Sequence, residues 1–213
     1  MMSMRLIPYV FIWVSWNTML AVIPVVAAYY IHRMMEEPGK SRLTKLYIIL
    51  LGLVWLGFLP NTCYLLTEWR HFLHTVGYSQ LFARWEYDAG AALKLGVYTL
   101  FFLCFSGVGV LTFTLAVRPI AAMARERGAA LWVWGLPFFL LMAIGVYLGL
   151  VLRFNSWDLF LKPAVVWGAA LALIYHPVLN LFILGFAAFL WIVYLAMDIW
   201  VDGFVVRWRA WLG

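Results

Sequence analysis

The sequence LYIILLGLVWLGFLPNTCYLLT, residues 46–67, contains no charged side chain over 22 consecutive positions. An α-helix rises about 1.5 Å per residue, so a helical run of this length crosses the hydrocarbon core of a bilayer, which is about 30 Å thick. Backbone amide and carbonyl groups must bond to each other inside lipid, and a helix satisfies all of them internally. The stretch therefore predicts a transmembrane helix.

Three further charge-free runs predict full spans of the same kind. They cover residues 9–31, 95–117 and 129–152. The run at 163–197 also lacks charge, but it is too long for one straight span and too short for two spans with a turn. Pro177 interrupts this run, because proline removes a backbone donor and clashes with the preceding turn. We therefore predict a half-membrane or re-entrant segment at 163–176 and a fifth span at 178–197, with six complete spans as the alternative.

The composition supports a chain that lies mostly in lipid. Hydrophobic residues make up 67% and charged residues 11%, with a mean hydropathy of +0.95, whereas soluble domains are about half apolar and a quarter charged. The spans and short loops use the whole chain, so residues 1–213 are predicted to form one all-α integral membrane domain. Cys63 and Cys104 form no metal-spaced motif.

The net charge of +6 arises from short basic clusters between the apolar runs. Such clusters are typical of topology signals and contacts to lipid headgroups. We therefore expect membrane lipid as a partner, with other membrane proteins as further candidates, and no nucleic acid. Nine of the 15 Lys and Arg fall on one side of the predicted topology, which the positive-inside rule assigns to the cytoplasm. These nine are Arg33, Lys40, Arg42, Lys45, Arg118, Arg125, Arg127, Arg207 and Arg209.

Three polar clusters interrupt the apolar pattern: FLPNTCYLLTEWRH at 58–71, RWEYD at 84–88 and RFNSWD at 153–158. The first ends the second span, the next precedes the third span, and the last ends the fourth. Chain parity places all three at one membrane face, and the charge count predicts that this face is extracytoplasmic. Gly145 and Gly149, just before the third cluster, form a small-xxx-small pattern that permits close helix packing.

The clusters contain candidates for acid–base or metal chemistry. In a continuing helix, Asn61, Tyr64, Glu68 and His71 share one face. One hypothesis makes Glu68, His71, Asp88 and Asp158 catalytic, with a divalent metal at Glu68, His71 and Asp158, and with His74 or His176 as further ligands. The alternative makes the same groups a structural network of ion pairs and hydrogen bonds. Both remain open from the sequence.

In order and spacing, these clusters resemble the bacterial membrane family known as domain of unknown function 1361. That family shows PNxxYxxTDxxH, then WYD, then GxYLGRFLRWNSWD, and the counterparts here are PNTCYLLTEWRH, WEYD and GVYLGLVLRFNSWD. Glu68 replaces an Asp, Glu86 is inserted, and Leu150 replaces an Arg. The resemblance implies a multi-pass protein of the bacterial inner membrane and supplies no mechanism. It supports the four catalytic candidates and adds a set of binding candidates: Asn61, Tyr64, Thr67, Arg153, Asn155 and Ser156.

Three functional classes fit this pattern. The favoured one is a polar binding or catalytic site at the extracytoplasmic face, acting on a lipid or envelope substrate. A non-catalytic subunit or assembly factor of a larger complex is the alternative. A transporter fits less well, because the sequence displays neither an inverted repeat nor polar residues near the middle of the spans.

Overall fold

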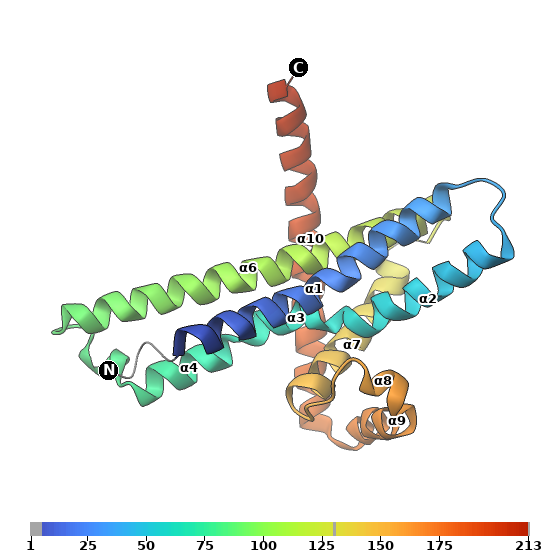
Figure 1. The fold of residues 1–213 in the computed structure, drawn as a ribbon. Coiled ribbons are helices and arrows are strands. Elements are labelled where there is room, and N and C mark those ends of the chain that lie inside the picture. Colours follow the sequence, from blue (N-terminus) through green and yellow to red (C-terminus); the bar gives the residue numbers. More distant parts are fainter. Residues whose placement is uncertain (1–5, 130, 213) are drawn as a thin grey trace.

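The computed structural model describes residues 6–129 and 131–212, and every regular element in this part of the chain is helical (Figure 1). Five helical runs are long and apolar enough to cross a membrane, and α9 is a shorter apolar helix. The prediction of an all-α membrane fold with five spans and one shorter segment is therefore confirmed. The five runs are α1 (Leu6–Glu36), α2 to α4, α6 (Ala89–Glu126), α7 (Leu131–Leu150) and α10 (Pro177–Leu212).

The second span consists of three consecutive helices, α2 (Arg42–Phe58), α3 (Pro60–Thr67) and α4 (Trp69–Tyr78). The single residues between them, Leu59 and Glu68, keep right-handed helical backbone angles, so the chain continues in nearly one direction. Pro60 opens α3, where a missing backbone N–H costs little. The polar residues after Thr67 thus stay helical, and the run extends beyond the predicted 46–67.

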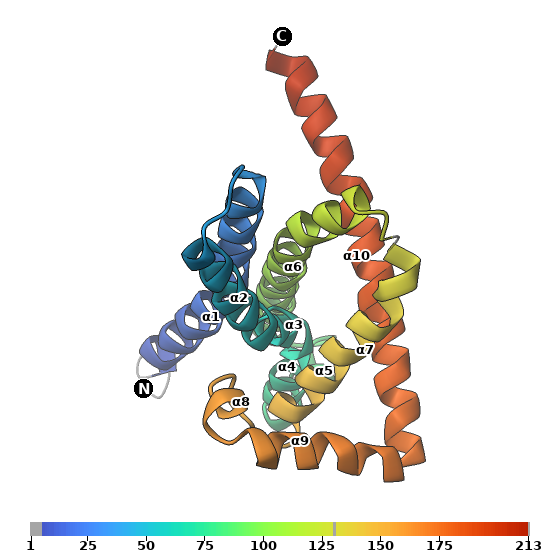
Figure 2. The same cartoon turned by 90° about the vertical axis from the view of Figure 1, so that its right-hand side faces the viewer.

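The connection from α7 to α10 contains α8 (Asp158–Leu161), α9 (Pro163–Ala172) and one turn of 3₁₀ helix, η1 (Leu173–Tyr175). His176 leaves the helical conformation and Pro177 opens α10, so the helix breaks where the proline predicts it. Figure 2 shows α9 lying across the ends of α7 and α10.

Two groups of helices build the molecule. Helix α1 packs against α2 and α6, and α3 packs against α6, whereas α7 pairs with α10. In Figure 1 the first group runs in one general direction and α10 crosses it steeply. The groups meet in an aromatic core, where Phe113 of α6 contacts Phe139 of α7 and Tyr194 of α10, all fully buried.

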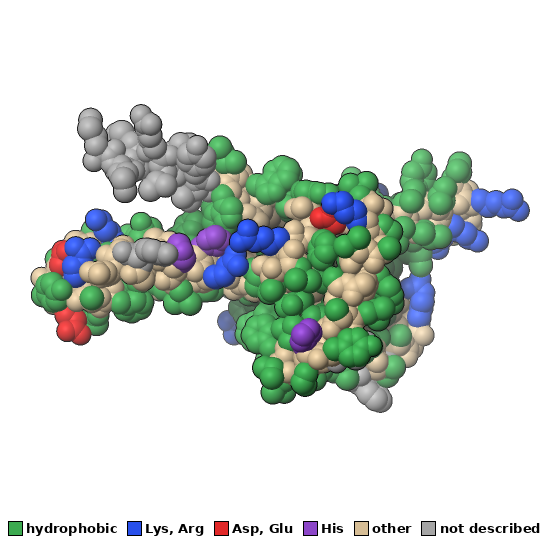
Figure 3. All heavy atoms as spheres, turned by 90° about the horizontal axis from the view of Figure 1, so that it is seen from below, with side chains coloured by type: hydrophobic (Ala, Val, Ile, Leu, Met, Phe, Trp, Pro, Cys, Tyr) green, Lys and Arg blue, Asp and Glu red, His purple; other side chains and the backbone are tan. Residues whose placement is uncertain are grey.

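The outer surface suits a lipid environment. Figure 3 shows hydrophobic side chains covering most of the visible body, with many charged side chains gathered toward its extremities. Large apolar residues such as Leu100 and Ile192 are exposed on the long helices. Because lipid tails solvate such residues as well as a protein core does, these exposed faces need no protein partner.

Candidate functional site

Helix α3, which carries the first polar cluster, is held at close range by glycines of two neighbouring helices. A Cβ atom at Gly109 of α6 would lie 2.7 Å from Leu65 Cβ, and one at Gly145 of α7 would lie 2.7 Å from Pro60 Cγ. A Cβ atom at Gly149 would overlap the Tyr64 phenol ring, whose hydroxyl donates to the Gly145 carbonyl at 3.2 Å. The Gly145 and Gly149 pair therefore forms a seat for Tyr64.

Asn61 joins the first cluster to the third across 95 positions of sequence. Its Nδ2 donates to Ser156 Oγ at 2.7 Å and to the Phe58 carbonyl at 2.9 Å. The Asn61 side chain is buried, so both bonds are shielded from water and help to fix the loop after α7 against α3. The bond places two of the clusters together, as chain parity predicts.

Asp158 organises the loop that follows α7. Its Oδ2 accepts from the Asn155 backbone N–H at 2.8 Å and from Asn155 Nδ2 at 3.4 Å, and its Oδ1 lies 3.6 Å from Lys162 Nζ. These bonds fold the loop between α7 and α8 back on the first residue of α8. The Asn155 backbone N–H, aided by the Lys162 charge, holds the pKa of Asp158 below its usual range, so the carboxylate stays ionised in its structural role.

Asp88 lies at the N-cap of α6 and does not reach the other candidates by any bond the structure describes. Its Oδ1 accepts from the backbone N–H groups of Gly90 at 2.9 Å and Ala91 at 3.2 Å. Two backbone N–H groups of the first turn, which have no partner within the helix, thereby gain an acceptor. This is the usual role of an N-cap aspartate.

Glu68 and His71 form a pair that faces a different neighbour from Asn61 and Tyr64. Glu68 Oε2 lies 3.3 Å from His71 Nε2, and the His71 ring packs edge-on against Trp13 of α1 at a centroid distance of 5.6 Å. The predicted polar stripe therefore divides, with one half directed at α7 and the loop that follows it, and the other half directed at α1. Thr67 donates to the Tyr64 carbonyl at 2.9 Å, a local helix contact.

The candidate metal ligands do not converge. Among residues 6–129 and 131–212, no group of three or more His, Cys, Asp and Glu side chains is placed to hold a metal ion, so Glu68, His71 and Asp158 are not one ligand set. His74 lies on α4, whereas His176 directly precedes α10, so the two histidines belong to segments far apart in the sequence. The divalent metal stays a prediction without geometric support.

Arg153 is the most available cation near the third cluster. It is exposed, and within the described parts of the chain it has no ion-pair or hydrogen-bond partner. Its backbone adopts a left-handed conformation with φ of 59°, which costs a non-glycine residue about 1 kcal/mol. That conformation turns the chain out of α7 and lets the Phe154 N–H bond the Leu148 carbonyl at 3.1 Å.

A cavity of about 570 Å³ opens beside these residues, and we call it the α7–α9 cavity. Among the described residues that line it, Tyr64, Asn155 and Ser156 are polar and none is His, Asp or Glu. The cavity is partly open to the outside, and Trp167 on α9, one of its lining residues, is 66% exposed. The apolar lining is Leu56, Gly57, Pro60, Leu141, Met142, Ile144, Gly145, Leu148, Gly149, Phe154, Leu159, Pro163, Ala164, Val166, Trp167 and Ala170.

Sequence reasoning found the polar end of this cavity and missed the wall that α9 supplies. Ala164, Trp167 and Ala170 belong to an apolar run, and no residue type in that run signals a binding role. The Pro177 break was the available signal, because it separates α9 from α10 and lets α9 fold back over α7.

A family model described as "Protein of unknown function (DUF1361)" covers residues 16–193. No curated protein and no solved structure matches the chain.

Proposed function

Because the chain belongs to the DUF1361 family, whose description assigns no activity, we propose a function from the geometry of the site. The protein binds a membrane lipid in the α7–α9 cavity, at the extracytoplasmic face of a bacterial inner membrane. The observation that carries this proposal is the lining of the cavity: a long apolar wall with Tyr64, Asn155 and Ser156 as its polar members.

That lining matches a lipid better than a water-soluble substrate. The apolar wall suits a hydrocarbon tail, and the two residues from the RFNSWD loop suit the headgroup or linkage region. Lipid tails are already in apolar surroundings within the bilayer, so filling the wall gains little free energy by itself. Selectivity must then come from the polar end, where the unpaired Arg153 next to Phe154 favours an anionic headgroup.

Binding is better supported than catalysis. Asp88 caps α6, Asp158 bonds to Asn155 in the loop before α8, and Glu68 pairs with His71 on the side of α1. A general acid or base must reach the reacting atoms, and none of these three carboxylates lines the cavity. The residues that do line it can position a lipid and have no evident means of transforming one.

The test compares two neighbouring positions on α9. Ala164 lines the cavity, whereas Val165 is exposed and does not line it. Ala164→Trp should fill the cavity and weaken binding of phosphatidylglycerol by about tenfold, equivalent to about 1.4 kcal/mol. Val165→Trp should leave binding unchanged. Native mass spectrometry of delipidated protein, reloaded with defined amounts of this lipid, measures the bound fraction.

Two results would contradict the proposal. Equal lipid occupancy in wild type and Ala164→Trp would place the bound lipid elsewhere. Equal losses in both variants, accompanied by the same loss of thermal stability, would show a general disturbance of α9. Arg153→Gln adds a check on the headgroup, because it should weaken phosphatidylglycerol and leave phosphatidylcholine unaffected.

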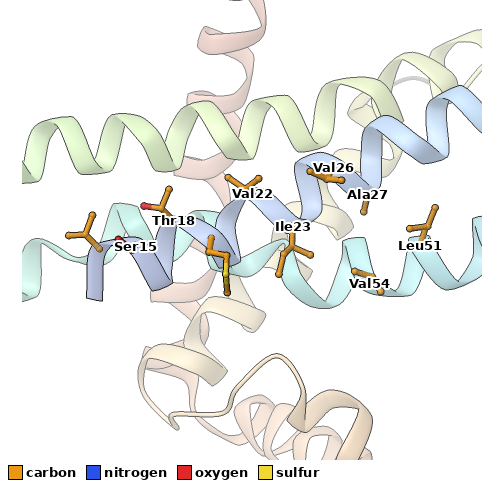
Figure 4. Close-up of a pocket in the computed structure, with 10 residues that line it drawn as sticks. Ser15, Thr18, Val22, Ile23, Val26, Ala27, Leu51 and Val54 are labelled. Atoms are coloured by element: carbon orange, nitrogen blue, oxygen red, sulfur yellow. The ribbon is translucent and has the colours of Figure 1, made fainter. Parts of the chain in front are cut away.

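A second candidate function, a non-catalytic subunit of a larger membrane complex, is favoured by a groove between α1 and α2 (Figure 4). The groove measures about 760 Å³, and its lining includes Val22, Val26 and Leu51. A transmembrane helix of another protein would fit such an apolar surface. A photo-crosslinker at Val22 should then give a protein adduct of defined mass in native membranes, and one at the exposed Leu103 of α6 should not.

A further inference from the structure

Helix α10 is much longer than a membrane span. Its 36 residues extend about 54 Å, whereas about 20 residues cross the hydrocarbon core. Counted from Pro177, those 20 residues end at Ala196, two positions before Asp198. There Arg118 of α6 forms ion pairs with Asp198, at 2.7 Å between Nε and Oδ1, and with Asp202. Ionised side chains are costly within the hydrocarbon, so we expect residues 199–212 to lie beyond it.

The segment beyond that edge carries an aromatic face. Trp200, Phe204, Trp208 and Leu212 follow one another at four-residue intervals, and the three rings stack with centroids 5.7 and 6.0 Å apart. Each of the four side chains is more than half exposed. At 100° per residue Trp200 lies about 160° around the helix from Asp198, which docks on α6, and each later member of the row turns about 40° back toward that side. Figures 1 and 2 show the end of α10 clear of the other helices, so no part of the row is covered by them.

The side chains of residues 199–212 indicate that the segment binds the surface of a membrane. After Asp202 the charged residues are Arg207 and Arg209, which lie on opposite edges of the aromatic face at 100° per residue. Tryptophan and phenylalanine flanked by arginine suit the interfacial layer of a membrane, where rings enter the acyl boundary and guanidinium groups meet anionic headgroups. Each basic residue near an anionic leaflet adds to the attraction.

The arrangement of the helices brings the segment near that layer. Helix α10 crosses α1, α2 and α6 steeply, and all four are candidate spans (Figure 1). They cannot all stand along the membrane normal, and a tilt of α10 would bring residues 199–212 toward the membrane surface. We propose that residues 199–212, the C-terminal anchor, lie in the headgroup layer and bind anionic lipid of the leaflet from which α10 emerges.

The test uses the full chain in nanodiscs, with a polarity-sensitive fluorophore on one cysteine. Cys104→Ser removes the exposed native thiol, and Cys63 is buried. Leu212→Cys places the label on the aromatic face, and Val206→Cys places it on the opposite face as a matched control. In nanodiscs of phosphatidylcholine and phosphatidylglycerol, acrylamide should quench the label at position 212 several-fold less than the label at 206. Replacing both Arg207 and Arg209 by Gln should reduce that protection.

Three results would overturn the proposal. Equal quenching at positions 206 and 212 would show that the segment projects into water. Protection that persists in pure phosphatidylcholine and survives the arginine substitutions would remove the role of anionic lipid. Protection in native membranes but not in nanodiscs would show that a protein covers the aromatic face.

Discussion

At the scale of single residues, the glycines around α3 explain more of the site than the carboxylates do. Tyr64 occupies the space that a side chain at Gly149 would need, and its hydroxyl bonds to Gly145. This contact places the polar residues of α3 next to the RFNSWD loop and forms one edge of the α7–α9 cavity. Asp88 and Asp158 stand out in the sequence as chemical candidates. In the structure Asp88 caps α6, and Asp158 accepts from the Asn155 backbone N–H in the loop before α8.

Gly149→Ala tests the seat of Tyr64. The added methyl group would overlap the phenol ring, so Tyr64 must move and lose its hydrogen bond to Gly145. We expect the free energy of unfolding to fall by about 1–3 kcal/mol, the usual cost of overpacking a close contact. Unfolding in detergent, followed by tryptophan fluorescence, measures the change.

Gly107→Ala is the matched control, because nothing lies within 4 Å of a Cβ atom at Gly107 in α6. Alanine is the better helix former, so this variant should be equal to wild type or more stable by up to about 1 kcal/mol. Equal destabilisation of both variants would mean that Tyr64 does not depend on the glycine seat.

At the scale of helices, one arginine ties α10 to α6. The Arg118 guanidinium contacts Asp198 and Asp202, and Arg125 lies 4.0 Å from Asp198. The Asp198 side chain is 14% exposed, so water replaces a lost partner poorly. Since α10 pairs with α7 along much of its length, this clamp sets how the two groups of helices meet.

Arg118→Gln should weaken that docking. It leaves Asp198 without its nearest cation, and we expect a loss of about 2 kcal/mol in the free energy of unfolding. Breaking a fully buried ion pair costs about 3–5 kcal/mol, and we expect a smaller loss here because Arg118 is partly exposed. Denaturant titration in detergent measures it. Arg207→Gln, at an exposed position of α10, should change stability by under about 0.5 kcal/mol. A loss of about 2 kcal/mol in this variant too would contradict a specific role for the Arg118–Asp198 ion pair.

At the scale of the whole molecule, an odd number of spans places the start of α1 and the end of α10 on opposite sides of the membrane. The α1–α2 connection and the end of α10 share one side, and the connection between α4 and α6 lies on the other. The basic residues concentrate at the first of these sides, which the positive-inside rule assigns to the cytoplasm.

Reporter fusions test this orientation. A fluorescent protein that matures in the cytoplasm should be active when fused after Leu212. Alkaline phosphatase, which needs an oxidising compartment, should be active when inserted between Ser79 and Gln80 and inactive at Gly39. Phosphatase activity at Gly39 would reverse the topology and place the α7–α9 cavity at the cytoplasmic face.

The sequence alone determined the fold class, because a charge-free run of about 20 residues can be satisfied in lipid only as a helix. It also determined the break at Pro177 and the positions of the polar clusters. Tertiary structure decided which groups meet: Asn61 with Ser156, Tyr64 with the glycine pair, and α9 over the cavity. The reason is that lipid makes the outer face of a helix as apolar as its inner face. Hydrophobic periodicity then does not report how each helix is rotated, and that rotation sets every contact of the site.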